Sequence, residues 1–368
     1  MSRGGGVLIA ILAAGCGFQK PGQPVDAAAG DGGDDGGPGS DAAQDPCVLP
    51  ALTLTVATLS GCDTAGTADG PRETARFSNP VNVVLGPGGI AYVADFDSNR
   101  VRKVDLAGKV TTVVAQANLR RPFGLAMSGD GYIYLETDDD DSGQHSLTTG
   151  TVWKVNPATG VAVVIARDLG RPRGLAVLPD GRIAMADHEH HVIQLLEPDT
   201  GVVTLLAGTL DVPGYANGTG ALALFAQPYD LVPYNGDLIV TDYDNQRLRR
   251  VTLTGVVTDF AGTGLPGSGN GPFATSTFFH PQGAAIDASG AIYVTEVGNH
   301  DVRKIAGGVV STVAGSTEAG WRDDNDPMQA MFYGVEGLDV SADGKRLVVA
   351  DGNIGDGMPF NHVRIVHQ

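Results

Sequence analysis

Four consecutive aspartates form the run with the clearest potential for metal chemistry. The sequence from Asp138 to Gly143 reads Asp-Asp-Asp-Asp-Ser-Gly. The oxygens of Asp138, Asp140 and Ser142 alternate as they do in the first half of a calcium loop, where glycine permits the turn. Thr149 occupies the twelfth position, where such loops carry a bidentate Glu. The run predicts calcium or another divalent ion as a candidate cofactor, and a solvated acidic hairpin is the simpler interpretation.

The run His188-Glu189-His190-His191 is a second candidate. Imidazoles and a carboxylate this close together could bind zinc, and adjacent histidines could act in acid–base catalysis. Neither a His-Glu-x-x-His helix nor a nearby cysteine pair supports a zinc site here. An exposed turn explains the run more simply.

The stretch Gly262–Gly267 spells Gly-x-Gly-x-x-Gly after an apolar run. A dinucleotide site needs a helix next, because the helix N-terminus binds the pyrophosphate. The residues Ser-Gly-Asn-Gly-Pro at 268–272 cannot open such a helix. We therefore interpret the motif as a loop.

A repeated sequence pattern predicts the strands and turns that must position these candidate residues. Each copy contains a strand, a tight turn such as Gly88-Gly89 or Asn235-Gly236, a second strand, a hairpin and a basic third strand. Copies recur at intervals of about 40 to 55 residues, which is typical of propeller blades. The residues that end the second strands are Asp95, Thr137, Asp187, Asp242, Glu296 and Asp351.

Counting strands predicts how the ring closes. Six copies of the first three strands are present, but only five fourth strands follow them, and the chain stops after a third strand at 362–368. The stretch Val56–Gly61 has the fourth-strand pattern and precedes the first copy. We therefore predict an all-β, six-bladed β-propeller of four-stranded antiparallel blades, in which the N-terminal strand completes the last blade and removes exposed sheet edges.

The phrases Tyr92-Val93-Ala94-Asp95 and Asn99-Arg100-Val101 resemble the NHL-repeat family of β-propellers. The resemblance covers roughly residues 51–368 and is looser where Thr137 replaces an acid. It implies a six-bladed ring with a central channel. It also implies a range of roles, from scaffolds to metal-dependent lyases and lactonases.

The first residues of the inner strands are expected to converge at the mouth of that channel. Lactonases that resemble this fold hold one divalent ion with Glu, Asn and Asp from different blades, which here would be Glu336, Asn82 and Asp230. Hydrogen-bonded polar residues in a water-filled channel are the simpler interpretation. We predict ligand binding by Arg173, Asp230, Gln282 and Glu336; the full set at this position is Asn82, Gly124, Arg173, Asp230, Gln282 and Glu336.

Residues 1–16 resemble a bacterial lipoprotein signal peptide. Arg3 precedes a short apolar stretch, and Cys16 stands where cleavage and lipidation would occur. Residues 17–46 are rich in Gly, Ala and Asp, and we predict a disordered tether. The propeller would then span 47–368, lipid-anchored in the bacterial cell envelope, with the outer membrane favoured.

The remaining cysteines and the charged residues bear on cross-linking, partners and contacts between blades. Cys47 and Cys62 are the remaining cysteines, and whether they are bridged stays open, because residues 47–54 would have to double back. The net charge of −18 argues against nucleic acid and anionic membranes as partners. We expect basic third strands, such as the one containing Arg102, to pair with neighbouring acids from blade to blade.

The preferred function is a non-catalytic, monomeric binding propeller. Its long loops, including 138–150 and 352–361, are expected on one face, where they would bind an envelope protein, a peptide or a glycan. The alternative is a metal-dependent lactonase or lyase with its ion in the channel.

Overall fold

The computed structural model describes residues 47–368. The predicted signal peptide, its lipidation residue Cys16 and the tether 17–46 lie outside the described residues. Within 47–368 there is no α-helix, and the 3-10 turns are Pro87–Gly89 and Gly220–Leu222. No helix in that part of the chain has the length and apolarity that a membrane crossing requires.

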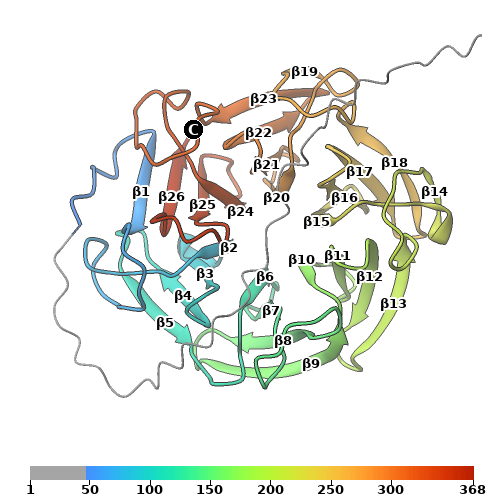
Figure 1. Ribbon diagram of the computed structural model, residues 1–368, viewed down its shortest axis with the longest axis horizontal. Helices are drawn as coiled ribbons and strands as arrows, with labels where there is room; N and C mark the ends of the chain where they lie inside the picture. The colour runs from blue at the N-terminus through green and yellow to red at the C-terminus, as the bar shows by residue number, and fades with distance from the viewer. Residues whose placement is uncertain (1–46) are drawn as a thin grey trace, which may run out of the picture. The chain divides into compact units, whose positions relative to one another are not determined.

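Six antiparallel sheets stand around a common axis as the blades of a ring (Figure 1). The predicted all-β, six-bladed propeller is therefore confirmed. Each blade is described from its inner to its outer strand. Blade 1 contains β2 (Pro80–Leu85), β3 (Ala91–Asp95), β4 (Arg100–Val104) and β5 (Val110–Val114); blade 2 contains β6 (Pro122–Met127), β7 (Ile133–Thr137), β8 (Gly150–Asn156) and β9 (Val161–Leu169); and blade 3 contains β10 (Pro172–Val177), β11 (Ile183–Asp187), β12 (Val192–Glu197) and β13 (Val202–Ala207). Blade 4 contains β15 (Pro228–Tyr234), β16 (Asp237–Asp242), β17 (Arg247–Thr252) and β18 (Val256–Ala261); blade 5 contains β20 (Pro281–Ile286), β21 (Ile292–Glu296), β22 (Asp301–Ala306) and β23 (Val309–Ala314); and blade 6 contains β24 (Gly334–Val340), β25 (Arg346–Gly352), β26 (His362–His367) and β1 (Val56–Gly61).

Blades 4 and 5 each carry a short fifth strand on the outer edge. These strands are β14 (Gly218–Thr219) and β19 (Gly271–Pro272), which pair with β18 and β23. They belong to the long connections that precede the two blades.

Strand β1 completes blade 6, as the strand count predicts. It pairs antiparallel with β26, with Val56 opposite Val366 and Gly61 opposite His362. Leu59 of β1 is buried in a cluster that joins blade 6 to blade 1. The core of the ring consists of such clusters between neighbouring blades, so each blade depends on both neighbours for burial of its apolar faces.

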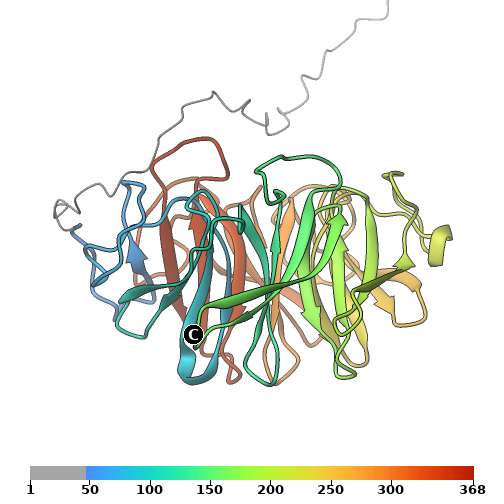
Figure 2. The same ribbon diagram turned by 90° about the horizontal axis from the view of Figure 1, so that it is seen from below.

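Each inner strand begins with an irregularity in its pairing. In β10, Pro172 pairs with Asp187 and Gly174 with Ala186, so Arg173 has no partner on β11. The other inner strands show the same shift near their first residues. A bulge of this kind bends a strand and re-aims a side chain. We call the face at which the inner strands begin the loop face; loops of blade 2 (green) and blade 6 (red) project from one face of the ring in Figure 2.

Four blades share a buried arginine that holds the long loop in place. The third-strand arginine pairs with the acid that ends the second strand of the same blade, and its other terminal nitrogen reaches a side chain of the preceding loop. The expected blade-to-blade pairing is therefore wrong, because both partners belong to one sheet. The pairs are Arg102–Asp95 at 2.9 Å, Arg249–Asp242 at 2.7 Å, Arg303–Glu296 at 2.5 Å and Arg364–Asp351 at 2.9 Å.

Blades 2 and 3 lack this arginine. In blade 2, Trp153 occupies its place, and the indole Nε1 donates to Thr137 Oγ1 at 2.9 Å. In blade 3, Gln194 stands there, and Asp187 binds His190 Nδ1 at 3.0 Å instead. The departure of Thr137 from the family pattern is thus matched by a change in its partner.

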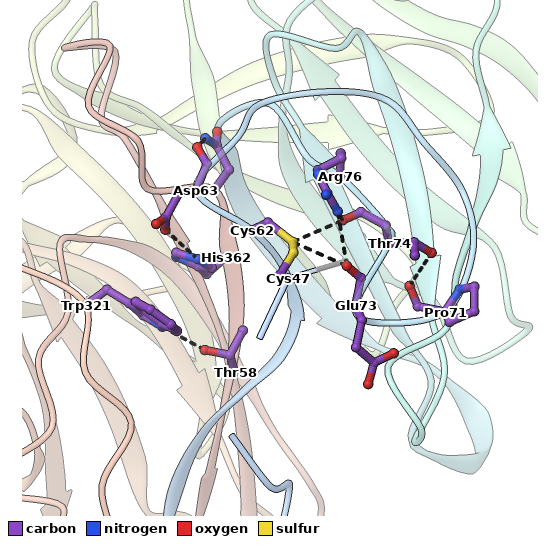
Figure 3. Close-up of a disulfide and its surroundings, with 12 residues drawn as sticks. Cys47, Thr58, Cys62, Asp63, Pro71, Glu73, Thr74, Arg76, Trp321 and His362 are labelled. Carbon is purple, nitrogen blue, oxygen red and sulfur yellow. Dashed lines mark hydrogen bonds and ion pairs between the residues drawn. A yellow bond between two sulfur atoms is a disulfide. The ribbon is translucent and has the colours of Figure 1, made fainter. Parts of the chain in front are cut away.

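The structure joins Cys47 to Cys62 by a disulfide, with the Cα atoms 6.1 Å apart (Figure 3). Segment 47–54 does double back, and the amide of Cys47 donates to the Glu73 carbonyl at 2.8 Å. Trp321 Nε1 donates to Thr58 Oγ1 of β1 at 2.8 Å. Hydrogen bonds from β26 and from the loop before blade 6 therefore hold the closing strand, and the disulfide ties segment 47–54 to the residue that follows this strand.

Candidate functional site

The bulge position of each inner strand supplies one side chain to the loop face around the ring axis. Arg173, Gln282 and Glu336, three of the predicted ligand-binding residues, occupy this position. The structure adds Phe123 and Tyr229, which follow Pro122 and Pro228 as Arg173 follows Pro172. The complete set is Val81, Phe123, Arg173, Tyr229, Gln282 and Glu336.

Asn82 and Asp230 lie one residue further along their strands, in a second layer made mostly of glycines. A Cβ on Gly174 would lie 2.6 Å from the Asp230 Cα, and one on Gly337 would lie 2.7 Å from the Asn82 Cα. Neighbouring inner strands approach so closely here that four of the six positions require glycine. The predicted set Asn82, Gly124, Arg173, Asp230, Gln282 and Glu336 therefore divides between two layers.

Asp230 binds backbone in this second layer. Its Oδ1 accepts from the amide of Leu231 and its Oδ2 from the amide of Ala284 in the next blade, both at 2.8 Å. Burial raises the pKa of Asp230 to about 7, although these two hydrogen bonds lower it by favouring the charged form. Asp339 links blade 6 to blade 1 in the same way, through the amide of Leu85 at 2.7 Å.

Arg173 is at the centre of the first layer. Its Nη2 donates to Asp138 Oδ2 at 2.5 Å, its Nε to Asp138 Oδ1 at 3.3 Å and its Nη1 to the Tyr229 hydroxyl at 2.6 Å. The guanidinium lies 4.3 Å from the centre of the Phe123 ring and 5.6 Å from that of Tyr229. Two aromatic rings and a carboxylate therefore fix its orientation.

Asp138 and Glu136 form a buried acidic pair beneath the guanidinium. Both side chains are fully buried. Although burial favours the neutral acid, the charge and hydrogen bonds of Arg173 lower the pKa of Asp138 to about 2. Burial and the charge of Asp138 raise the pKa of Glu136 well above its usual value. The pair thus carries one proton and one negative charge, which Arg173 neutralises.

His188 lies against the same group. Its ring stacks on Tyr229 with 5.2 Å between centroids and 21° between planes. Only 8% of the residue is exposed, and neither ring nitrogen has a hydrogen-bond partner among residues 47–368. Burial and the charge of Arg173 lower the pKa of His188 well below its ordinary value, so the imidazole is neutral.

Half-buried aromatic rings continue from Tyr229 around the axis. Tyr243 lies 5.4 Å from Tyr229, and His280 stacks on Tyr243 at 4.3 Å with 5° between planes. On the other side, Phe96 meets Phe123 edge to face at 6.0 Å. We call Phe96, Phe123, Tyr229, Tyr243 and His280 the aromatic arc.

Glu336 closes the first layer beside Gln282. Gln282 Nε2 donates to Glu336 Oε2 at 3.2 Å, and both side chains are buried. Burial raises the pKa of Glu336 to about 8, despite the opposing charge of Arg173. Glu336 is therefore mainly a neutral acid at pH 7.

The predicted metal oxygens of the acidic hairpin have separate partners. Asp138 binds Arg173, whereas Asp140 Oδ1 accepts from the amide and hydroxyl of Ser142 at 2.8 and 2.7 Å. The hydroxyl of Ser142 thus serves the turn, and Asp141 pairs with Arg167 at 2.9 Å.

The histidine run disperses in the same way. His190 binds Asp187, while His191 Nδ1 accepts from the amide of Gln227 at 3.1 Å. Glu189 lies 3.5 Å from Arg171. Across residues 47–368, no three His, Cys, Asp or Glu side chains form a group that could hold a metal ion.

The sequence contains signals for the residues that the first interpretation omitted. Proline before Phe123 and Tyr229 marks the same register as proline before Arg173. Glu136 stands where the other blades carry alanine or threonine, which the aligned second strands make visible.

Comparisons with known proteins agree with the ring described above. No protein-family model matches the sequence. NHL repeat-containing protein 2 of Bos taurus is 33% identical over 117 residues, which is 29% of this chain and 16% of that protein. The chain is an NHL-type six-bladed β-propeller. Protein SUPPRESSOR OF QUENCHING 1, chloroplastic, of Arabidopsis thaliana is 26% identical over 279 residues, 65% of this chain and 26% of that protein. The NHL propeller thus spans far less than two thirds of either relative.

Solved structures share the fold of this NHL propeller at low identity. A Bacteroides thetaiotaomicron protein of unknown function has a TM-score of 0.68 and 22% identity, covering 85% of this chain and 75% of its own. An auxiliary nutrient binding protein of the same organism has a TM-score of 0.66 and 14% identity, covering 84% and 75%. A gluconolactonase of Xanthomonas campestris has a TM-score of 0.55 and 14% identity, covering 88% and 96%. At these identities the likeness concerns the fold alone.

Proposed function

We propose that this chain is a non-catalytic binding propeller that holds a protein, peptide or glycan on its loop face, at Arg173 and the aromatic arc. The observation that carries the proposal is the arc itself. Phe123 and Tyr229 flank one oriented guanidinium, and the half-buried rings of Phe96, Tyr243 and His280 continue the arc on either side. Aromatic faces combined with a few placed polar groups are typical of ligand sites. The nutrient-binding description of one structural neighbour supports a binding role.

Binding measurements on one arc residue test the proposal. The purified chain is titrated calorimetrically with soluble oligosaccharides and with peptides. Tyr243→Ala removes a ring that stacks on His280, and we expect at least about a tenfold loss of affinity, equivalent to about 1.4 kcal/mol. Tyr132→Ala, in the β6–β7 turn away from the loop face, is the matched control. Equal affinity in both variants would contradict a site at the arc.

The alternative is a lactonase or lyase with a metal held by Asp230, Glu336 and Asn82. The lactonase neighbour motivates it. In this arrangement, however, both Asp230 oxygens accept backbone amides, and Asn82 Oδ1 accepts the amide of Val83 at 2.7 Å. The three side chains therefore do not form a ligand set as they stand. Lactone hydrolysis that a chelator abolishes would establish the alternative.

The envelope location is proposed from the sequence. Lipidation at Cys16 would tether a monomeric propeller to the bacterial outer membrane. Cys16→Ala should leave the protein in the soluble fraction or unprocessed, and membrane association equal to that of the wild type would contradict the anchor.

A further inference from the structure

We propose that the loop-face site selects an uncharged glycan, with Asp138 as the residue that sets this specificity. This inference rests on the binding role proposed above. Its basis is the charge balance of the site: the guanidinium of Arg173 is fully compensated by Asp138 at 2.5 Å. Nearby cations are also paired, Arg171 with Glu189 at 3.5 Å and Arg121 with Asp139 at 3.6 Å. At Arg173, Arg171 and Arg121, a carboxylate on a ligand would therefore find no uncompensated positive charge.

The remaining polar groups suit hydroxyl groups. Arg173 has N–H groups beyond the three that contact Asp138 and Tyr229, because a guanidinium carries five. The side-chain amide nitrogen of Gln282 donates to Glu336, and its side-chain oxygen Oε1 accepts no hydrogen bond from residues 47–368. His188 offers one donor and one acceptor, and leaving both unmet in a buried site is costly. Donors and acceptors next to ring faces, without net charge, match a sugar ring.

Matched oligosaccharides test this selection. The full chain is titrated with neutral cello-, xylo- and malto-oligosaccharides and with oligogalacturonate of the same length. We expect a neutral oligosaccharide to bind at least about tenfold more tightly than the uronate, and Asp138→Asn to raise uronate affinity by exposing the charge of Arg173. The wild-type ratio decides the selection against charge even if the variant does not fold, and an unchanged ratio in Asp138→Asn would refute the role of Asp138.

Each other outcome overturns the inference. Equal or tighter binding of oligogalacturonate by the wild type would refute selection against charge. Binding of peptides but of no sugar would refute the glycan while leaving the binding role intact. Binding of neither class would overturn the proposed function itself.

A second inference follows independently from the disulfide and the register of β1. Cys47 and Cys62 bracket the whole of β1, with a sequence separation of 15. Val56 lies opposite Val366 near the C-terminus, whereas Gly61 lies opposite His362 at the far end of the pair. The other edge of β1 contacts the loop before blade 6 through backbone bonds between Val56 and Asp324 at 2.9 and 3.1 Å.

The disulfide changes how a pulling force would reach β1. Without the disulfide, tension between the chain ahead of Cys47 and the C-terminus loads β1 and β26 at the same end, so their hydrogen bonds break one after another. With the disulfide, tension passes from Cys47 directly to Cys62 and on to Asp63, so β1 lies inside the closed loop and is not on the loaded covalent path. We infer that Cys47–Cys62 is a mechanical clasp that protects ring closure from tension on the N-terminal segment.

Single-molecule stretching tests the clasp. The full chain is held by its N-terminal segment and by Gln368, in oxidised and reduced buffer. We expect reduction to introduce a low-force event that releases the segment containing β1, and Cys47→Ser with Cys62→Ser to show the same event without reductant. Identical first-rupture forces in the oxidised and reduced chains would overturn the inference.

Discussion

Arg173 and Asp138 form an ion pair that joins blade 3 to blade 2 at the loop face, with 2.5 Å between Nη2 and Oδ2. The two residues come from the two blades that lack the buried arginine of the other four. Where blades 1, 4, 5 and 6 hold their guanidinium inside the sheet, blades 2 and 3 use a guanidinium at the ring axis. The guanidinium of Arg173 is therefore the cation at the centre of the candidate site.

Removing the cation of this pair should cost considerable stability. Arg173→Met leaves the fully buried Asp138 without its partner, and we expect the free energy of unfolding to fall by about 3 kcal/mol. Chemical denaturation measures this loss. Arg182→Met, which removes an exposed pair with Asp180, is the control and should cost less than about 1 kcal/mol. Equal losses would contradict the burial of Asp138.

The Trp153–Thr137 pair makes blade 2 intolerant of the common acid. Thr137→Asp places a buried carboxylate where no guanidinium is available, and we expect a loss of about 3 kcal/mol or a failure to fold. Thr137→Ser keeps the hydroxyl that accepts the indole N–H and should cost about 1 kcal/mol. An aspartate variant as stable as the serine variant would refute this pairing.

Glu336 should make stability depend on pH. Its folded pKa of about 8 exceeds the ordinary glutamate value of 4.5, so between these two pH values the folded state binds more protons and the free energy of unfolding falls as pH rises. Glu336→Gln removes this dependence. Between pH 4.5 and 8, the free energy of unfolding of the variant should rise relative to that of the wild type by more than about 1 kcal/mol, since one pKa unit equals about 1.4 kcal/mol.

Urea denaturation at the two ends of that pH window checks this prediction. The exposed Glu318→Gln controls for the change of side chain. A stability difference between Glu336→Gln and the wild type that stays constant with pH would show that Glu336 is charged in the folded protein.

Ring closure by β1 can be tested at one side chain. Leu59→Ala opens a cavity in the cluster between blades 6 and 1, and we expect a loss of about 2–4 kcal/mol in unfolding experiments. Leu106→Ala, at a residue that is 57% exposed, should have little effect. If both substitutions proved neutral, β1 would not be part of the folded ring in solution.

The repeat predicts much of this fold because its signals are local. Turn glycines, the acids that end second strands and the surplus of one fourth strand at Val56–Gly61 are visible in the sequence, and each has a fixed place in a blade. The basic third strands were visible too, but their partners were not. Arg102 reaches Asp95 on its own sheet because its side chain points along the second strand rather than to the next blade.

The candidate site is less predictable because it depends on bulges and on contacts between blades. Aligning the inner strands by their first polar residue places Asp230 beside Arg173, whereas the bulge aligns Tyr229 with Arg173. The partnership of Asp138 with Arg173 joins residues 35 positions apart in sequence. Nothing in the aspartate run itself distinguishes Asp138, which is buried in an ion pair, from Asp140, which closes a turn.

A crystal structure of the chain with a bound neutral oligosaccharide is the most direct test of the central claim. We predict a sugar ring stacked on Tyr229 or Tyr243, with hydroxyl groups within hydrogen-bond distance of Arg173 or Gln282. A ligand bound at the outer edges of the blades, or on the face opposite the loops, would contradict the proposed site.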